Sequence, residues 1–484
     1  KRNKQFNINK TEALIGREHE MAQLADFAAS GRAEFVALYG RRRVGKTFLV
    51  RSFFKDKFAF YATGIIEGSF EQELEAFNIG LNNYGYDGAP ATNWMEAFKA
   101  LAALLKRKCA RRRKRQVVFV DELPCFDTPN SGFVPALDFF WNSCGSWMDN
   151  IFFVVCGSAT SWMVKNLVYS HGGLHKRLTH DIHLHPFDLY TTERYCKSRS
   201  GRWDRLAILQ MYTALGGVPY YWSLVDFTKS VAENIDKMFF DDSAKLKLEY
   251  HALYRSVYRR PEAYLAVIDM LAQNKQGMTR AELAGALNII DNGRFGDILS
   301  DLVHCDFVRL YNNGTKRVGG IFQLMDFFTL FYHRFGTAST TDNHFWKNHI
   351  NDPKQNNWYG LAFERVCQFH FRHITQALGV SGIHTEFYAW RSKHSTPAAQ
   401  IDMIVERADG VVNICEMKYS RLPYELTLAE ADKIQYREQA FLRENPSKTW
   451  TQVVLVTTRG LKGGAHDHIA QKVLNLDHLF LDVK

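Results

Sequence analysis

Short, nearly continuous runs of apolar residues mark the first third of the chain. Three of them read FVALY (35–39), VVFV (117–120) and IFFVVC (151–156). Runs of this length without polar interruption are typical of strands that are buried on both faces of a parallel sheet. A segment of helical character, FLVRSFF, comes shortly after the first run. The pattern predicts an α/β domain built around a parallel sheet.

The middle of the chain changes to helical periodicity. EAYLAVIDMLAQ, MTRAELAGALNI and NGRFGDILSDLVH each read as a short helix, and VRLYNNGTKRVGGIFQL reads as a hairpin that turns at residues 312–315. Three short helices and a hairpin predict a winged-helix domain. Its helix at 294–304 would lie in a DNA groove, although Asp297 and Asp301 on that helix suit phosphate poorly. A lid on a nucleotide or a surface for a partner protein is an equal alternative.

Two apolar strands flank the turn signal Ala408-Asp409-Gly410 near the end of the chain. Asp402 and Glu416 each lie seven residues from Asp409, so a hairpin folded about that residue sets them opposite each other. Lys418 shares a face with Glu416 because side chains alternate along a strand. Two carboxylates and an ammonium group are therefore predicted to meet on one face. A solvated hairpin with a cross-strand ion pair is the alternative.

The loop after the first apolar run has the composition of a phosphate cradle, or P-loop. It consists of Gly40, Arg41, Arg42, Arg43, Val44, Gly45, Lys46 and Thr47. Glycine at both ends lets the main chain approach an anion closely, and the N–H groups between them then surround the phosphate. Lys46 would reach the outer phosphates, Thr47 would hold Mg²⁺, and the following helix offers its positive N-terminus. The sequence therefore predicts a nucleoside triphosphate site at residues 40–47.

The second apolar run ends in an acidic pair and the third in a hydroxyl group. Asp121 would hold Mg²⁺, and Glu122 would orient or deprotonate the attacking water. Ser158 would lie between these carboxylates and the terminal phosphate as a sensor. The carboxyl ends of parallel strands meet at one edge of a sheet, so these groups are expected beside the P-loop. The acidic pair favours hydrolysis, and ATP is favoured over GTP because no NKxD-like guanine motif is present.

Length, cysteines and charge limit the remaining possibilities. The 484 residues, of which 46% are hydrophobic, are enough for about three domains. The first residues, KRNKQFNINK, have no apolar signal core and the apolar runs are too short to span a bilayer, so we expect a cytoplasmic protein without a membrane segment. Eight scattered cysteines predict neither a zinc site nor a disulfide framework.

The net charge of +10 permits a nucleic-acid partner without requiring one. The densest basic run is KRKCARRRKR at 106–115. It is either a solvated loop ahead of a strand or a contact to DNA or RNA, and the sequence leaves both interpretations open.

The P-loop, the acidic strand and the polar strand end together resemble the signal-transduction ATPases with numerous domains (STAND). The similarity is to their archaeal-type branch within the wider AAA+-like group. GREHE at 16–20 resembles a family element that lies near the adenine, which implies nucleotide contacts from Gly16 and Arg17. Gly217-Val218-Pro219 resembles the GxP element that follows the core sheet of the family.

The same resemblance implies an arginine that senses the γ-phosphate. Arg177 lies where relatives carry this residue, and Lys176 and Arg194 are alternatives. Such an arginine acts either within its own chain or on a neighbouring subunit. A homo-oligomer or a protein partner is therefore compatible with the sequence.

The C-terminal hairpin resembles the catalytic core of the PD-(D/E)xK nucleases. Asp402 matches the acidic residue of that motif, and Glu416 and Lys418 match its ExK part, although the proline that often precedes the acidic residue is absent. In that family the carboxylates bind Mg²⁺ and the lysine positions or activates the hydrolytic water. Glu364, on a helix upstream, matches a further carboxylate that members often add. The resemblance covers residues 355–465 approximately and implies a restriction-endonuclease-like α/β domain.

Together these patterns predict an α/β chain of three domains. Residues 1–245 would form a P-loop ATPase domain with a helical extension, 246–345 a winged-helix domain and 346–484 a PD-(D/E)xK nuclease-like domain. The predicted function is ATP hydrolysis coupled to a Mg²⁺-dependent, nuclease-like domain that acts on DNA. The alternative is an ATP-driven regulatory switch whose nuclease-like domain binds a ligand but does not cut. A GTPase or a metabolic kinase fits the acidic pair less well.

Overall fold

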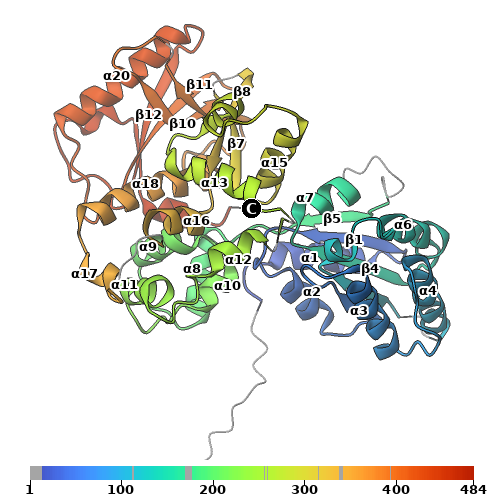
Figure 1. Cartoon of the computed structure of the whole chain (residues 1–484). Coiled ribbons are helices and arrows are strands. Elements are labelled where there is room, and N and C mark those ends of the chain that lie inside the picture. Colours follow the sequence, from blue (N-terminus) through green and yellow to red (C-terminus); the bar gives the residue numbers. More distant parts are fainter. Residues whose placement is uncertain are drawn as a thin grey trace, which may run out of the picture. The chain divides into compact units, whose positions relative to one another are not determined.

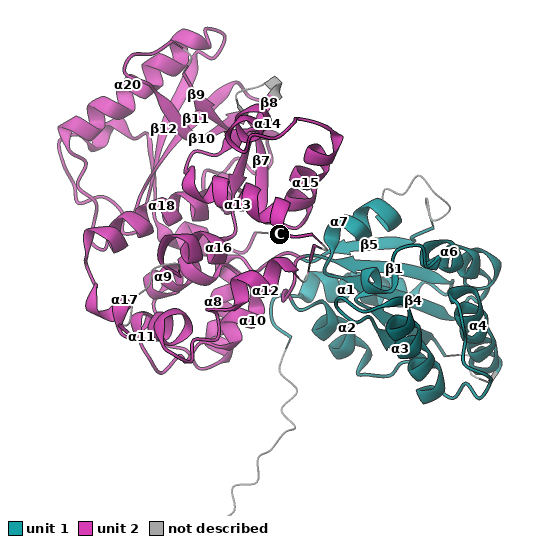
Figure 2. Cartoon of the chain, viewed as in Figure 1, with its two compact units in different colours: residues 1–40, 45–184 teal, residues 41–44, 185–484 magenta. Residues whose placement is uncertain are grey.

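The computed structural model describes residues 14–111, 114–168, 177–255, 257–258, 260–313, 316–336, 342–392 and 394–483. They form two compact units (Figure 1; Figure 2). The first unit comprises residues 1–40 and 45–184, and the second comprises residues 41–44 and 185–484. The division into three domains at 245/246 and 345/346 stays a prediction. In the described ranges, no helix combines the length and the apolar character needed to cross a bilayer.

Five parallel strands form the sheet of the first unit, in the spatial order β2-β3-β4-β1-β5. They are β1 (Glu34–Tyr39), β2 (Phe60–Thr63), β3 (Gln116–Asp121), β4 (Ile151–Gly157) and β5 (His180–His183). Every residue of β1, β3 and β4 is buried, as their apolar runs predict. The predicted α/β architecture with a parallel sheet is therefore confirmed.

Helices cover both faces of this sheet. They are α1 (Glu18–Ala29), α2 (Lys46–Phe54), α3 (Phe70–Asn83), α4 (Trp94–Arg111), α5 (Leu123–Phe126), α6 (Phe133–Ser143) and α7 (Thr160–Met163). Alternate strand residues such as Phe35 and Phe153 share a core with α3, α4 and α6. On the opposite face, the ring of Phe152 lies 5.1 Å from that of Phe54 on α2. Two covered faces explain why these strands show no polar alternation.

Glu73 on α3 is a buried carboxyl group that contacts the main chain. Its side chain is 0% exposed, and its oxygens accept hydrogen bonds from the N–H of Ile65 at 3.0 and 3.2 Å. Burial raises the pKa of Glu73 to about 7, because the charged form loses its hydration. The carboxylate is therefore a source of instability at neutral pH and above.

We expect Glu73→Gln to stabilise the protein by about 1–3 kcal/mol above pH 7. The pKa of this group is higher in the folded than in the unfolded chain, so the stability of the native protein falls as the pH rises towards about 7. Glutamine keeps an acceptor for Ile65 and carries no charge, so this loss should disappear. Urea unfolding at about pH 5 and about pH 8 measures the difference. An unchanged pH dependence in the variant would contradict the expectation.

The second unit contains thirteen of the helices in the described residues. They are α8 (Leu189–Ser198), α9 (Arg205–Leu215), α10 (Pro219–Ser223), α11 (Val231–Ile235), α12 (Glu249–Arg255), α13 (Glu262–Gln273), α14 (Arg280–Ala286), α15 (Gly293–His304), α16 (Phe327–Phe331), α17 (Phe345–Asn348), α18 (Pro353–Phe369), α19 (Phe371–Ala377) and α20 (Leu428–Glu444). Many of them contribute to one shared core, which includes Leu209, Ile268 and Phe331.

The strands of the second unit form one mixed sheet in the order β13-β12-β11-β10-β9-β7-β8-β6. They are β6 (Met278–Thr279), β7 (Val308–Asn313), β8 (Lys316–Leu324), β9 (Thr385–Arg391), β10 (Gln400–Arg407), β11 (Val411–Lys418), β12 (Trp450–Thr457) and β13 (Lys472–Leu474). The order of α13, α14, α15 and the β7–β8 hairpin is the one predicted for a winged helix. That assignment stays a prediction, and residues 314–315 of the predicted turn lie outside the described residues.

The β7–β8 hairpin is an internal part of this sheet. Val308 pairs with Leu324 within the hairpin, and Asn313 of β7 pairs with Ala389 of β9. The hairpin therefore joins the strands of the C-terminal segment rather than projecting as a separate wing.

Helices cover both faces of the C-terminal strands. Phe363 of α18 shares a core with Cys415 of β11. Phe441 of α20 shares another core with Ile414, the neighbouring residue of β11. Successive side chains point to opposite faces of a strand, so α18 and α20 pack on opposite sides of the sheet.

Candidate functional site

The glycines at the two ends of the P-loop have dihedrals that other residues rarely adopt. Gly40 has φ 145°, and a Cβ there would lie 2.3 Å from the main-chain oxygen of Leu184. Gly45 has φ 96° at the N-cap of α2, and a Cβ there would meet no atom within 4 Å. Close packing therefore requires the first glycine, and backbone conformation favours the second. A loop of this kind fits the close approach of a phosphate.

Lys46 and Thr47 begin α2 and contact groups at the carboxyl ends of the strands. The ammonium group of Lys46 donates to the main-chain oxygen of Gly40 at 2.9 Å and to Oγ of Ser158 at 3.0 Å. Oγ1 of Thr47 donates to Oδ2 of Asp121 at 2.8 Å. The structure thus brings together the predicted phosphate lysine, the predicted sensor and both predicted Mg²⁺ ligands of this unit.

Glu122 adopts a left-handed conformation that is strained for a residue with a side chain. It has φ 47° between β3 and α5, and its oxygens accept from the N–H and Oγ of Ser158 at 3.0 and 2.7 Å. Burial, with the nearby charge of Glu122, raises the pKa of Asp121 to about 6. Two crowded carboxyl groups beside a loop of this shape fit Mg²⁺ and an activated water.

Residues 41–44 belong to the second unit, although they lie within the P-loop sequence. The guanidinium group of Arg41 lies 2.5 Å from Oδ1 of Asp326, and the two side chains are 3% and 1% exposed. Burial lowers the pKa of Arg41, but the charge of Asp326 and its hydrogen bond outweigh this effect and raise the pKa. Asp326 also accepts from Oγ1 of Thr329 at 2.6 Å. This buried ion pair connects Arg41 to the start of α16 within the second unit.

The other two arginines of the loop also have partners in the second unit. Nη2 of Arg43 lies 2.8 Å from Oε2 of Glu249, and its guanidinium group lies over the ring of Tyr220. Nη1 of Arg42 donates to the main-chain oxygen of Ala252 at 3.4 Å. The sequence predicts nucleotide contacts from these residues, which the N–H groups can still provide. The carboxylate partners were not foreseen, because no sequence pattern pairs residues so far apart.

The residues expected at the adenine and the γ-phosphate lie in the following places. Gly16 has φ 69°, and Arg17 is buried at the start of α1. Arg177 is exposed in the turn before β5. Lys176 lies outside the described residues, and Arg194 lies over the ring of Tyr190 in α8. The roles of these residues at the nucleotide stay predictions.

The GxP element makes a close main-chain contact. A Cβ on Gly217 would lie 1.8 Å from the main-chain oxygen of Phe187, and the oxygen of Gly217 accepts from the N–H of Phe187 at 2.7 Å. Pro219 then begins α10. Only glycine fits at residue 217 without displacing this neighbouring chain.

The register of the C-terminal hairpin is the one that the sequence predicts. Met403 of β10 pairs with Cys415 of β11, and the ladder continues to the pair of Glu406 with Val412. Oε1 of Glu416 lies 2.9 Å from Nζ of Lys418. Glu416 and Lys418 share the face on which α20 packs, where they contact Arg437 and Glu430.

Asp402 lies where the register of β10 shifts, between Ile401 and Ile404, which both pack in the core of α20. The placement of Asp402 on the face of Glu416 stays a prediction.

Glu364 of α18 belongs to the same group of charges. Burial and the charges of Asp402 and Glu416 raise the pKa of Glu364, those of Arg365 and Lys418 lower it, and the pKa comes to about 7. A divalent cation would relieve the repulsion among these carboxylates, so the residues present fit Mg²⁺.

Arg437 of α20 is a residue of this site that the sequence did not reveal. Its Nη1 lies 2.8 Å from Oε2 of Glu416, so both oxygens of Glu416 contact a cation. Gln368 of α18 donates to the main-chain oxygen of Asp402 at 3.0 Å. The sequence could have indicated only that some basic residue on the helix after the hairpin contacts the site. Because α20 carries several basic residues, the sequence does not single out Arg437.

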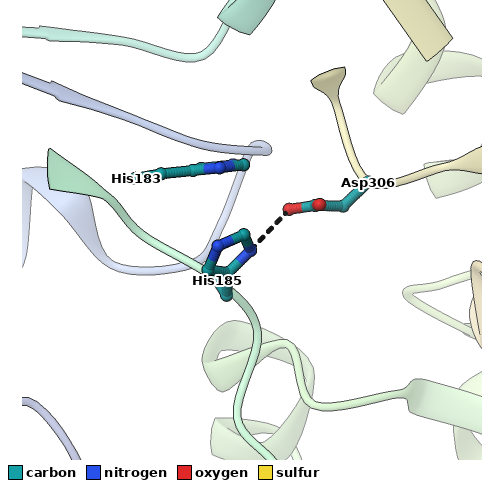
Figure 3. A group of neighbouring side chains, drawn as sticks. All are labelled: His183, His185 and Asp306. Carbon is teal, nitrogen blue, oxygen red and sulfur yellow. Dashed lines mark hydrogen bonds and ion pairs between the residues drawn. The ribbon is translucent and has the colours of Figure 1, made fainter. Parts of the chain in front are cut away.

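A separate polar pair of the second unit joins the segment after β5 to the end of α15. Nδ1 of His185 lies 3.2 Å from Oδ2 of Asp306, and the side chains are 57% and 25% exposed (Figure 3). Exposed pairs of this kind contribute little to stability. We assign no functional role to it.

Comparison with protein families identifies the class of the first part of the chain. Residues 14–225 match the model of an ATPase domain found predominantly in Archaea. These residues include the P-loop, the acidic strand and the GxP element. They form an ATPase domain of the archaeal type, as the sequence predicts, and this class implies nucleotide binding.

Individual relatives are distant. An uncharacterized protein of Methanocaldococcus jannaschii, MJECL04, is 22% identical over 370 residues, which cover 73% of this chain and 76% of that protein. The Walker-type ATPase PABY2304 of Pyrococcus abyssi matches with a TM-score of 0.46 and 15% identity, over 66% of this chain and 96% of that one. The ORC2 protein of Aeropyrum pernix matches with a TM-score of 0.42 and 15% identity, over 70% and 96%. These similarities are too weak to assign a function.

Proposed function

We propose that this protein hydrolyses ATP at its P-loop and that the nucleotide state controls Mg²⁺-dependent cleavage of DNA by the C-terminal segment. The proposal is supported by Glu416 and Lys418, whose Oε1 and Nζ lie 2.9 Å apart at the end of β11, and by the charges of Asp402, Glu416 and Lys418 that act on Glu364. Carboxylates that hold a hard cation, beside a lysine, are the groups that metal-assisted phosphodiester hydrolysis needs. The net charge of +10 suits a polyanionic substrate.

In the ATPase domain, Lys46 and the N–H groups of the loop would hold the phosphates, and Thr47 with Asp121 would hold Mg²⁺. The metal ion would neutralise charge on the transferred phosphoryl group. Glu122 would orient the attacking water. Ser158 holds Glu122 through two hydrogen bonds. If Ser158 donated one of these bonds to a phosphate oxygen instead, Glu122 would move in response to the bound nucleotide.

The resemblance to STAND ATPases supports three further assignments in this domain. Gly16 and Arg17 would lie near the adenine. Arg177 would contact the γ-phosphate, either in its own chain or in a neighbouring subunit. Nucleotide exchange would then depend on the position of Gly16 and Arg17 and of the segment before β5 that carries Arg177.

In the C-terminal segment, Asp402 and Glu416 would bind Mg²⁺, with Glu364 as a further ligand. Lys418 would position the hydrolytic water close to the scissile phosphate. Arg437 contacts Glu416 in the present structure, so it would have to share or release that carboxylate when a metal ion binds. Displacement of Arg437 would then be a step at which the nucleotide state could act.

We expect the native chain to cleave plasmid DNA with Mg²⁺ or Mn²⁺, and Asp402→Asn to do so at least about a hundredfold more slowly. Asparagine has nearly the same shape as aspartate but lacks the charge that holds the cation. Agarose electrophoresis of plasmid and linear DNA, with and without ATP, measures this difference.

The matched control is Asp409→Asn, which changes the same functional group in the turn of the same hairpin. Asp409 is 37% exposed and pairs with Arg407, so its replacement should leave cleavage unchanged. Intact DNA under every condition, from protein that still hydrolyses ATP, would contradict the proposed cleavage. If Asp402→Asn and Asp409→Asn lost cleavage equally, the cause would be damage to the hairpin instead.

A regulatory switch that binds without cutting is the second candidate function. It is favoured by the contacts of Glu416, whose two oxygens are engaged by Lys418 and Arg437. If the protein is such a switch, Asp402→Asn would leave its response to nucleotide intact, and Lys46→Ala would abolish that response. Size-exclusion chromatography with ADP and with a non-hydrolysable ATP analogue separates the candidates, because a switch would change assembly with nucleotide and leave DNA uncut.

A further inference from the structure

The second unit contains a cavity of about 420 Å³ that the P-loop and the carboxylate site do not use. It lies between α9, α11 and α18 and the chain that leaves β11. Six of its lining residues matter for recognition. They are Trp203, Gln210, Trp346, Gln355, Tyr359 and Arg421. A volume of this size is typical of pockets that hold small organic ligands.

The two amide side chains of this cavity present acceptors. Nε2 of Gln210 donates to the hydroxyl of Tyr419 at 2.8 Å, and Nε2 of Gln355 donates to the main-chain oxygen of Trp346 at 2.7 Å. Within the described residues, no group donates to either Oε1 atom. The two amides are therefore oriented by their donors and leave two carbonyl oxygens for a ligand that carries N–H groups.

Arg421 is the one charged residue of the lining. Its Nη1 donates to Oδ1 of Asn351, and its Nε is buried without a hydrogen-bond partner among the described residues. The described ranges place no carboxylate within ion-pair distance of its guanidinium group. A partly buried guanidinium group without a counter-ion favours an anionic group on the ligand.

The remaining walls are aromatic and apolar. Trp346 and Tyr359 are 1% and 2% exposed, and Trp203 is partly exposed. Trp203 is therefore the ring that a planar ligand can reach, and Trp346 and Tyr359 close the apolar wall behind it. Exposed Ile350 continues this surface along the lining.

We propose that this cavity binds one nucleotide unit with an exocyclic amino group. The base would lie against the aromatic walls, its amino group would donate to Gln210 or Gln355, and its phosphate would contact Arg421. A flat ring, an N–H donor and an anion on one molecule match the three kinds of group that the cavity presents. The unit comes either from a free nucleoside monophosphate or from the end of a single strand. The inference is independent of the proposed cleavage of DNA.

The test measures binding of AMP, CMP and TMP to the full chain by titration calorimetry and tryptophan fluorescence. It is carried out in the Lys46→Ala background, so that the P-loop contributes little. We expect AMP and CMP to bind with a dissociation constant between about 10 μM and 1 mM, and TMP, which has no exocyclic amino group, to bind at least about tenfold more weakly. A 5′-phosphorylated oligonucleotide as a separate ligand distinguishes a strand end from a free nucleotide.

Arg421→Gln should weaken the binding of AMP at least about tenfold, because the phosphate of the ligand loses its contact with a cation. The matched control is Arg459→Gln, which removes a guanidinium group paired with Asp204 outside the cavity and should leave binding unchanged. Gln210→Leu should remove the preference for AMP over TMP, and this readout remains if the arginine variant does not fold. Absence of AMP binding, equal binding of TMP, or tighter binding of a free aromatic amino acid would each overturn the proposal.

Discussion

A Lys46→Ala chain is expected to hydrolyse ATP at least about a hundredfold more slowly than the native chain. Lys46 is 5% exposed, and its ammonium group contacts the oxygen of Gly40 and Oγ of Ser158. In the proposed site, this position would let one cation contact both the phosphates and Ser158, the residue that holds Glu122. Alanine would remove the charge that stabilises the transferred phosphoryl group. Steady-state phosphate release at saturating Mg²⁺ and ATP measures the loss.

Lys57→Ala is the matched control for this experiment. Lys57 is exposed and lies just after α2, the helix that Lys46 begins. Its replacement removes the same charge without touching the P-loop and should leave hydrolysis within about twofold of the native rate. If Lys46→Ala retained more than about a tenth of the native rate while folded, residues 40–47 would not be the hydrolytic site.

Asp326→Asn is expected to lower the free energy of unfolding by about 3–5 kcal/mol. The substitution leaves the buried guanidinium group of Arg41 without its carboxylate and weakens the bonds that Asp326 makes to Thr329 at the start of α16. A buried charge that loses its hydrogen-bonded carboxylate is costly, because water cannot replace the partner in a dry environment. Urea unfolding followed by circular dichroism measures the change.

The control for this prediction is the exposed pair between Arg280 and Asp291. Its side chains are 42% and 43% exposed, compared with 3% and 1% for Arg41 and Asp326. Asp291→Asn should therefore cost less than about 1 kcal/mol, because water solvates both groups after the pair is broken. Equal destabilisation by the two variants would show that burial does not set the strength of the Arg41 pair.

Much of the ATPase domain could be predicted because its signals are local. The apolar runs that become β1, β3 and β4 end at the groups that lie together in the structure, since parallel strands align their carboxyl ends. The register of the C-terminal hairpin was also predictable. A turn signal at Asp409 fixes the pairing from Glu406 with Val412 to Met403 with Cys415. The register shift between Ile401 and Ile404, next to Asp402, could not be predicted from the alternation of side chains.

The contacts that were not predicted join residues far apart in the chain. Arg41 and Asp326 are separated by 285 positions, and a single sequence contains no signal that pairs them. Arg437 lies on a helix whose basic residues have the same local pattern, so periodicity does not show which of them contacts Glu416. The pairing of β7 with β9 depends on how two segments dock, which neither strand encodes alone.

That pairing has a consequence for how such chains can be assembled from modules. Asn313 of β7 meets Ala389 of β9, so each segment covers a strand edge of the other. Separating them by truncation or by gene fusion would expose main-chain donors and acceptors that readily pair with another chain. The helical segment with its hairpin and the C-terminal strands are therefore expected to be inherited, expressed and exchanged as a single piece.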